Sequence, residues 1–419
     1  MRKRGWLAVV MALTPALAQQ KPTAPPAPPP QPGPPPADWS RNLDKGLNSS
    51  RYEFRIPMNV ERLAGPENLT RTATVTELEK LLDSYTGKSD EKLAEAIAKF
   101  ALTERVSHAR LEAWKRRCPG TESRQALLAL ADAAEFLDLP PGDVSSDPAP
   151  TIAEQRRMMA ALGAYLGKAL PALPNFLATR KTVYFEDWPS HVDWPTAPGV
   201  PDSTDTTNAL RMQNRPFYLL GKAKSTVTYR DGREVPQTRR LATADDPYQA
   251  HLTTRGEFGP ILVAVVSDAA QAQLTFKEWE ASEDGRLAVF RFAVPQGKSH
   301  YMVKSLSGKD EQPQAYKGEI AIRPADGSVM RLTVRAEMPQ DTDVQVAGIH
   351  VQYGTVEIGG KNYICPVHGV ALTKVPIKRQ VGKARAGAPP LQTQVNDVSF
   401  EEYHVFRSSS RIASVDKSE

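Results

Sequence analysis

Several patterns that usually reveal a protein's chemistry are missing from this 419-residue sequence. It has no His-Glu-x-x-His pair, no Gly-x-Ser-x-Gly turn, no phosphate-binding P-loop and no dinucleotide-binding glycine motif, and its seven histidines are scattered. No side chain is therefore marked as a catalytic nucleophile or a metal ligand. We predict a protein without enzymatic activity, without a metal and without a cofactor.

Cysteine is scarce, because the chain has only Cys118 and Cys365, far apart in sequence. If they pair in an oxidising compartment, the disulfide closes a long loop and stabilises the fold by about 4 kcal/mol. If they do not pair, Cys118 lies at a helix end before Pro119-Gly120 and Cys365 lies on a strand. The sequence leaves both alternatives open.

Long apolar runs are also missing. The apolar run from Trp6 to Leu13 falls short of the ~20 residues needed to span a bilayer, so a membrane anchor is the weaker interpretation. Basic residues precede this run, and the small-x-small pattern of a signal-peptidase site, ending at Ala18, follows it. We predict a signal peptide over residues 1 to 18 with cleavage after Ala18, and a periplasmic or secreted protein that is at most peripheral to a membrane.

The sequence has little excess charge of either sign. Its formal net charge is +5, and removal of the three basic residues of the signal peptide leaves 50 basic and 48 acidic residues, or +2. Nucleic-acid binding is not expected from such a balance. The one basic cluster lies in a Gly- and Pro-containing stretch that we interpret as a solvated loop, with contact to an anionic surface as the alternative; its members are Lys374, Lys378, Arg379, Lys383 and Arg385.

Proline, by contrast, dominates residues 19 to 37, which favour extended polyproline II and cannot form a core. We interpret this segment as a tether and residues 38 to 73 as irregular. From residue 74 the pattern is helical, beginning with a Thr74-x-x-Glu77 capping box and ending with a helix that starts at the Thr151-x-x-Glu154 box. Five helices are expected, forming a bundle or array over residues 74 to 172.

From about residue 175 the pattern changes to strands. Four pairs of alternating runs are joined by residue pairs that favour tight hairpin turns: Asp231-Gly232, Asp284-Gly285, Asp326-Gly327 and Gly359-Gly360. Residues 398 to 412 supply a closing strand. We therefore predict an antiparallel domain over residues 175 to 412 and a disordered tail over residues 413 to 419.

The run after Asp326-Gly327 predicts how this sheet faces. Met330, Leu332 and Val334 alternate with Arg331 and Thr333, which indicates one dry face and one wet face. The three apolar residues should point into the concave side of the sheet. Residues 253 to 268 are too densely apolar for an alternating strand, and we predict that they form a helix covering the dry face. The fold class is thus α+β, with an N-terminal helical bundle followed by a curved antiparallel sheet, or half-barrel, packed on a helix.

Two short motifs offer chemistry but favour structural roles. Cys365-Pro366-Val367-His368 has the spacing of two zinc ligands, yet a structural zinc site needs four and the sequence has no second pair. The Asp-Trp-Pro repeats at residues 187 to 189 and 193 to 195 flank His191, which brings together two carboxylates and an imidazole. Because Trp-Pro steps force extended backbone, we interpret this stretch as a loop that packs its tryptophans on the sheet.

The hairpin-rich C-terminal part resembles the lipoprotein-carrier and outer-membrane lipoprotein-sorting superfamily. The resemblance is carried by the run of hairpins and by Gly318-Glu319-Ile320 followed by residues 326 to 332. It implies a half-open antiparallel barrel around a helix, which binds a lipid or another apolar ligand on its concave face. The residues that would contact such a ligand are Phe290, Phe292, Met330, Leu332, Val334 and Tyr353.

Two alternatives stand beside this function. In the first, the protein is an interaction scaffold of the cell envelope, its tether and helices hold a protein partner, and the sheet has a filled core. In the second, supported only by the Asp-Trp-Pro loop, it is a hydrolase. An open apolar cavity between sheet and helix would favour ligand binding, whereas a filled face leaves no room for an acyl chain.

Overall fold

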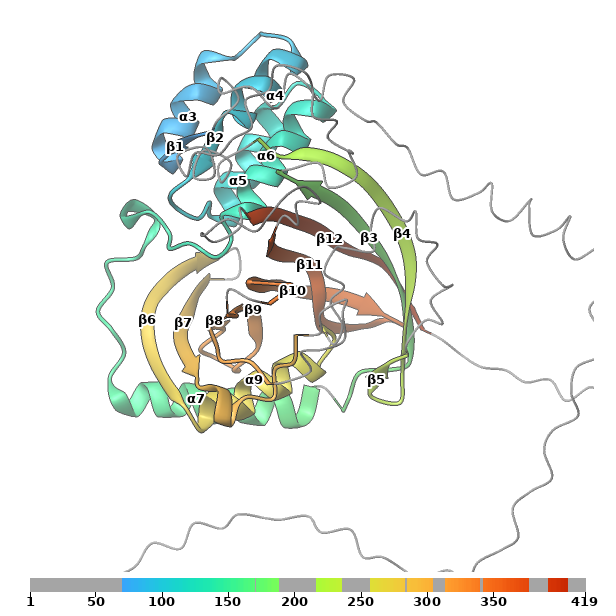
Figure 1. The fold of residues 1–419 in the computed structure, drawn as a ribbon. Helices are drawn as coiled ribbons and strands as arrows, with labels where there is room; N and C mark the ends of the chain where they lie inside the picture. Colours follow the sequence, from blue (N-terminus) through green and yellow to red (C-terminus); the bar gives the residue numbers. More distant parts are fainter. Residues whose placement is uncertain are drawn as a thin grey trace, which may run out of the picture. The chain divides into compact units, whose positions relative to one another are not determined.

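The computed structural model describes most of the chain after residue 69, and within that part the protein is α+β (Figure 1). The described residues are 70–169, 171–187, 216–235, 257–282, 285–303, 313–339, 342–376 and 391–405. The predicted signal peptide with its Ala18 cleavage site, the tether, most of the basic loop and the C-terminal tail lie outside them. None of the described helices is long and apolar enough to cross a bilayer.

Four helices share one apolar core: α3 (Val75–Ser84), α4 (Asp90–Ala98), α5 (His108–Arg117) and α6 (Thr121–Ala133). A short parallel pair, β1 (Arg71–Ala73) and β2 (Phe100–Leu102), lies beside them. The predicted capping box is confirmed, because Thr74 Oγ1 accepts a hydrogen bond from the Glu77 N–H and Glu77 Oε2 accepts one from the Thr74 N–H. This region is followed by a 3₁₀ turn, Pro141–Asp143.

The fifth predicted helix is α7 (Ile152–Ala169), and it packs elsewhere. Its Thr151–Glu154 capping box is confirmed. The sequence grouped α7 with the other helices, but the apolar residues Met158 and Leu162 pack in the core of the large sheet instead. The reason is that the core of α3 to α6 is complete without it, whereas the sheet has an apolar face to cover.

The large sheet has ten antiparallel strands in the order β5-β4-β3-β12-β11-β10-β9-β8-β7-β6 and is not closed. All four predicted hairpins are present. The last strand, β12, does not lie at an edge but joins β3 to β11. The bounds are β3 (Phe176–Glu186), β4 (Tyr218–Arg230), β5 (Arg233–Glu234), β6 (Gln273–Ser282), β7 (Gly285–Val294), β8 (Tyr316–Ile322), β9 (Val329–Glu337), β10 (Val346–Ile358), β11 (Lys361–Pro376) and β12 (Leu391–Val405); a 3₁₀ turn, Gln296–Lys298, follows β7.

One face of the sheet, which we call the apolar face, is covered by α7 and α9 (Pro260–Ala270). The sequence predicted the helix α9. Figure 1 shows both helices beside strands β6 to β9. Leu332 and Val334 lie on this face, as predicted, in one core with Leu262 and Val265 of α9. The helix therefore covers the dry face.

The prediction for Met330 is wrong. A β-bulge interrupts the pairing of β8 with β9, because Ala321 pairs with Arg331 while Ile322 pairs with Val329. The extra residue turns Met330 to the opposite face, where it packs with Leu287, Val289 and Ala321. A bulge adds one residue to a strand, so residues on its two sides no longer follow the same alternation between faces. The sequence pattern therefore assigned Met330 to the wrong face.

The prediction of a wet face is also wrong. Arg331 and Thr333 are only 5% and 6% exposed. They lie on the second face of the sheet, which we call the polar face. His350 is on the same face because it pairs with Thr333. His368 is there too, because Gln352 pairs with both His368 and Arg331. The helical part of the chain covers this face, and the buried guanidinium of Arg331 is paired there with Glu280 and Glu319.

Candidate metal centre

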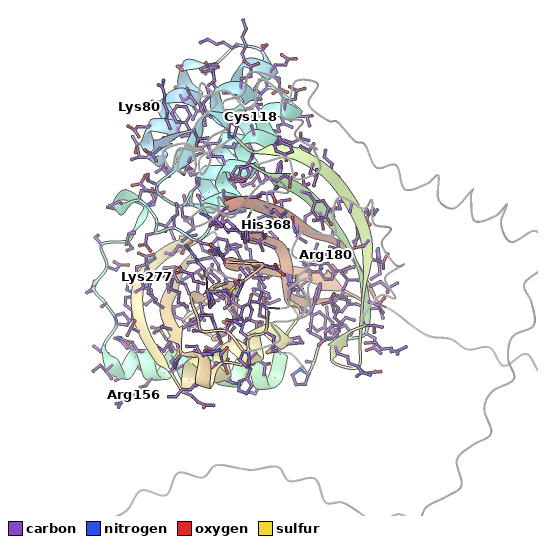
Figure 2. The ribbon with its side chains drawn as sticks, in the orientation of Figure 1. Lys80, Cys118, Arg156, Arg180, Lys277 and His368 are labelled. Atoms are coloured by element: carbon purple, nitrogen blue, oxygen red, sulfur yellow. The ribbon has the colours of Figure 1, made fainter. Side chains whose placement is uncertain are left out.

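Five ionisable side chains meet where α6 lies on the polar face: Asp132, Glu135, His350, His368 and Asp397. We call them the acid–imidazole cluster. Asp132 belongs to α6. Glu135 lies in the turn that follows this helix, and its backbone N–H donates to the Asp132 carbonyl (3.2 Å). The other three belong to β10, β11 and β12; His368 is labelled in Figure 2.

The sequence of α6 brings Asp132 to the sheet because this helix is buried on two sides. Leu127 and Leu130 face the helical core, whereas Ala129 packs on the polar face with residues of three strands, among them Val370. Asp132 lies three residues after Ala129 and so occupies the same side of the helix. The Phe136 ring then approaches Gly348 so closely that a Cβ there would lie 2.7 Å from it.

The strand register places the remaining members next to one another. Val370 of β11 pairs with His350 on one side and with Asp397 on the other, so all three side chains share the polar face. His368 lies two residues before Val370 and therefore on the same face. The result is a row of polar side chains across three adjacent strands, directly under α6.

Three of these side chains converge on one point. One potential ligand atom each from Asp132, His368 and Asp397 lies within 4.8 Å of the others. His368 Nε2 and Asp397 Oδ2 are 2.6 Å apart, which is a hydrogen-bond distance. Beside them, Glu135 Oε2 lies 3.3 Å from His350 Nδ1, and the rings of His350 and His368 are 6.2 Å apart.

The cluster contains an unusual number of unsatisfied polar atoms. Asp132 is 0% exposed, and neither of its carboxylate oxygens has a hydrogen-bond partner within the described part of the chain. Glu135 Oε2 and His350 Nδ1 likewise form no hydrogen bond there. A buried polar group without a partner costs about 1–3 kcal/mol, and more if it is charged, so such a group calls for a proton, a water or an ion.

The pKa values of the cluster reflect its burial and the charges within it. Burial, and then the nearby carboxylates of Asp397 and Glu135, raise the pKa of Asp132 well above its ordinary value. Burial also raises the pKa of Glu135 and lowers that of His350 well below its ordinary value. Burial lowers the pKa of His368, but its hydrogen bond to Asp397 outweighs this and raises it. The cluster thus holds more carboxylate than its own cations neutralise.

The donor set fits a divalent transition metal. Carboxylate oxygens and imidazole nitrogens bind Zn²⁺ at about 2.0–2.2 Å in a tetrahedral arrangement, which places two ligand atoms roughly 3.3–3.6 Å apart. The three atoms lie within 4.8 Å of one another, so a movement of about 1 Å would bring them around an ion. Imidazole favours Zn²⁺ and related metals over Mg²⁺ or Ca²⁺. Metal binding would replace the proton between His368 and Asp397 and give the Asp132 carboxylate a positive partner.

A buried ionic network adjoins the cluster on the polar face. Glu280 accepts hydrogen bonds from Arg105 (2.9 and 3.3 Å) and from Arg331 (2.6 Å). Burial acts to raise the pKa of Glu280, but the guanidiniums of Arg331 and Arg105 outweigh it and lower the pKa to about 2. Burial raises the pKa of Glu135, and these two arginines act against that rise and so favour the ionised form of this carboxyl group.

The six residues that the sequence proposed as ligand contacts lie elsewhere. Phe290, Phe292, Leu332, Val334 and Tyr353 are between 0% and 4% exposed in the core under α7 and α9. The Tyr353 hydroxyl donates to the Glu257 carbonyl (3.0 Å). Met330 lies on the polar side of the sheet. Their role as ligand contacts stays a prediction.

The short motifs separate in the fold. Cys365 packs in an apolar cluster with Phe258, whereas His368 lies on the polar face, so they cannot bind one metal ion together. Cys118 and Cys365 are both buried and unpaired, which confirms the second alternative. Of the Asp-Trp-Pro stretch, only Asp187 is among the described residues; it is 5% exposed and accepts a hydrogen bond from the Thr393 N–H (2.7 Å).

Comparison of the chain with protein-family models, with curated proteins and with solved structures finds no match. The resemblance to the lipoprotein-carrier superfamily therefore stays a prediction. The sequence also missed the acid–imidazole cluster, because its ligands come from residues 132, 368 and 397 with no motif spacing. The available signal was weak: isolated polar residues, such as His350, Gln352 and His368, in parts of β10 and β11 that are otherwise mostly apolar.

Proposed function

We propose that the protein is an exported, non-enzymatic protein that binds one divalent transition-metal ion, with Zn²⁺ as the best fit. The ligands are Asp132, His368 and Asp397. The observation that carries the proposal is the fully buried Asp132 carboxylate, which has no hydrogen-bond partner in the described chain and faces an imidazole and a second carboxylate.

The burial of the ligands supports a structural role for the metal. Asp132 is 0% and Asp397 7% exposed, and about a quarter of the His368 side chain (24%) is accessible. Structural metal sites are closed by protein ligands, whereas catalytic sites keep a position open to substrate. Glu135 and His350 lie beside the three ligands and can complete the shell or orient it through hydrogen bonds.

Metal titration of the full chain tests this function. The protein is stripped with a chelator, and Zn²⁺ binding is followed by calorimetry and by metal analysis after gel filtration. We expect one Zn²⁺ per chain and at least a tenfold loss of affinity in Asp132→Asn and Asp397→Asn. Asp138→Asn is the matched control, because Asp138 follows α6 but is 70% exposed and pairs with Lys277 and Arg291.

Two results would overturn the proposal: a wild-type chain that takes up no Zn²⁺, Mn²⁺ or Co²⁺ at one equivalent, or an Asp132→Asn variant that binds Zn²⁺ as tightly as wild type. If Asp138→Asn loses the metal as well, the binding lies on the exposed surface rather than in the cluster.

A second candidate function is that of an envelope interaction scaffold. It is supported by the apolar face of the sheet, which α7 and α9 cover in one continuous core. A half-barrel that binds lipid would have to move one of these helices to admit an acyl chain. Native mass spectrometry of protein recovered from the envelope separates the two: a bound lipid mass favours the carrier, and a lipid-free chain with a protein partner favours the scaffold.

A further inference from the structure

We infer that the metal ion governs the docking of the helical region (residues 74 to 135) onto the sheet, so that the joint closes when the ion binds and loosens when it leaves. This inference rests on the metal-binding function proposed above. Its basis is the origin of the ligands: Asp132 comes from α6, whereas His368 and Asp397 come from the sheet. Only the docked arrangement brings all three together.

The helical region has a core of its own. Four helices and the β1–β2 pair surround an apolar cluster that includes Leu78, Ile97, Trp114 and Leu127, each 0–1% exposed. None of these residues belongs to the clusters of the sheet. The helical region can therefore separate from the sheet as a unit without opening its own core.

The joint between the two is divided into an apolar part and a polar part. In the apolar part, Leu128, Ala129 and Ala133 of α6, together with Phe136, pack against residues of the sheet that include Val370 and Val395. The polar part holds the Arg105–Glu280 pair and the acid–imidazole cluster. Three carboxylates lie in that cluster, and neither oxygen of the fully buried Asp132 carboxylate has a hydrogen-bond partner among the described residues. Burying such a group without a partner is unfavourable, so without an added cation this part of the joint opposes docking.

Mass action gives the expected size of the effect. An ion that binds the docked form alone multiplies the docked-to-undocked ratio by 1 + [M]/Kd, which is about 100-fold when the free metal is 100 times Kd. Exchange of backbone amides that requires undocking should slow by the same factor. Amides whose exposure does not require undocking should be unaffected.

Hydrogen exchange with mass spectrometry on the full chain tests this inference. Exchange is compared in Zn²⁺ at 100 times Kd and in excess chelator. We expect peptides from α6 to exchange roughly 100-fold more slowly with Zn²⁺, because this helix can open locally only when the sheet no longer covers it. Peptides from α9, on the opposite face of the sheet, should exchange at equal rates in both conditions, and they also report whether the sheet remains folded.

Two variants separate the metal from the rest of the joint. Asp132→Asn should abolish the difference between Zn²⁺ and chelator. Glu280→Gln removes the Arg105 pair but no ligand, so it should speed exchange at the joint in both conditions while leaving a Zn²⁺ response. If Asp132→Asn also loses protection in α9, it has unfolded, and the wild-type comparison alone decides.

The outcomes distinguish this inference from the function on which it rests. If wild type binds one Zn²⁺ per chain and exchange at α6 is unchanged, the coupling is refuted and the metal site stands. If no metal binds, both proposals fall. Slowing that extends equally to α9 shows general stabilisation of the chain, and it refutes control of this joint in particular.

Discussion

Replacement of Glu280 by glutamine should destabilise the protein through charge rather than shape. The Glu280 carboxylate lies between the guanidiniums of Arg105 and Arg331, whose side chains are only 4% and 7% exposed. Glutamine has nearly the same size but no charge. The variant therefore leaves two buried guanidiniums facing a neutral amide, and Arg105 forms no other ion pair among the described residues.

The size of the effect follows from the pKa of Glu280. The two arginines outweigh the effect of burial and lower this pKa from an ordinary 4.5 to about 2. A shift of this size corresponds to about 3 kcal/mol in favour of the ionised form in the folded state. Breaking a buried ion pair by removing one partner costs about 3–5 kcal/mol, which is the same range. We therefore expect Glu280→Gln to lose about 3 kcal/mol of unfolding free energy at pH 7.

The pH dependence separates this explanation from a packing defect. Because the folded-state pKa lies below the unfolded one, the contribution of Glu280 is present above about pH 4.5 and is lost as the pH falls towards 2. Urea unfolding of wild type and variant at several pH values measures it. The difference between them should shrink from about 3 kcal/mol at pH 7 to near zero at about pH 2.

A stability difference between wild type and variant that stays constant at all pH values would refute the electrostatic reasoning. At low pH Glu280 is protonated and neutral, so it should behave like glutamine. Glu337→Gln is the matched control. It makes the same change on a strand of the same sheet, but Glu337 is 53% exposed and pairs with Lys317 and Arg335 at the surface. Exposed pairs of this kind contribute up to about 1 kcal/mol, so this variant should change stability little.

Two further predictions concern other buried positions. Burial raises the pKa of Asp187 to about 7, so between about pH 4 and 7 the folded protein holds a proton that the unfolded chain lacks. Wild-type stability should therefore fall by up to about 4 kcal/mol as the pH rises through this window. Asp187→Asn should remove that fall in urea unfolding, and an unchanged slope would contradict the prediction. Gly348→Ala should cost about 1–3 kcal/mol in the same assay, because its Cβ would lie 2.7 Å from the Phe136 ring, and a neutral result would show that α6 shifts freely on the sheet.

Much of the fold could be predicted from local patterns. Each predicted helix from residue 74 onward is present, because caps such as Thr74–Glu77 and apolar stripes are properties of short segments. The hairpins were predictable for the same reason, since Gly232 and Gly327 adopt the positive φ that their turns require (77° and 74°). The division into domains over residues 74 to 172 and 175 to 412 stays a prediction, and α7 belongs to the core of the sheet.

The errors arose where a residue depends on distant neighbours. Arg331 and Thr333 have the alternation of solvent-facing residues, and nothing local shows that the helical region covers them. Arg331 is tolerated inside because Glu280 and Glu319, from two other strands, pair with it. Such partners are known only once the strand order and the packing of α6 are known. A polar residue in a strand pattern therefore identifies a face but not its solvent exposure.

The acid–imidazole cluster was hidden for a related but stronger reason. A metal motif is recognisable when its ligands share one helix or loop, because the spacing then fixes their geometry. Here β12 reaches β11 only through the order of the sheet, and Asp132 reaches both only through docking of α6. The ligands come from separate elements, and for this reason no sequence motif identifies the site. For the same reason the site can report assembly, because its ligands are held together only when those elements have assembled.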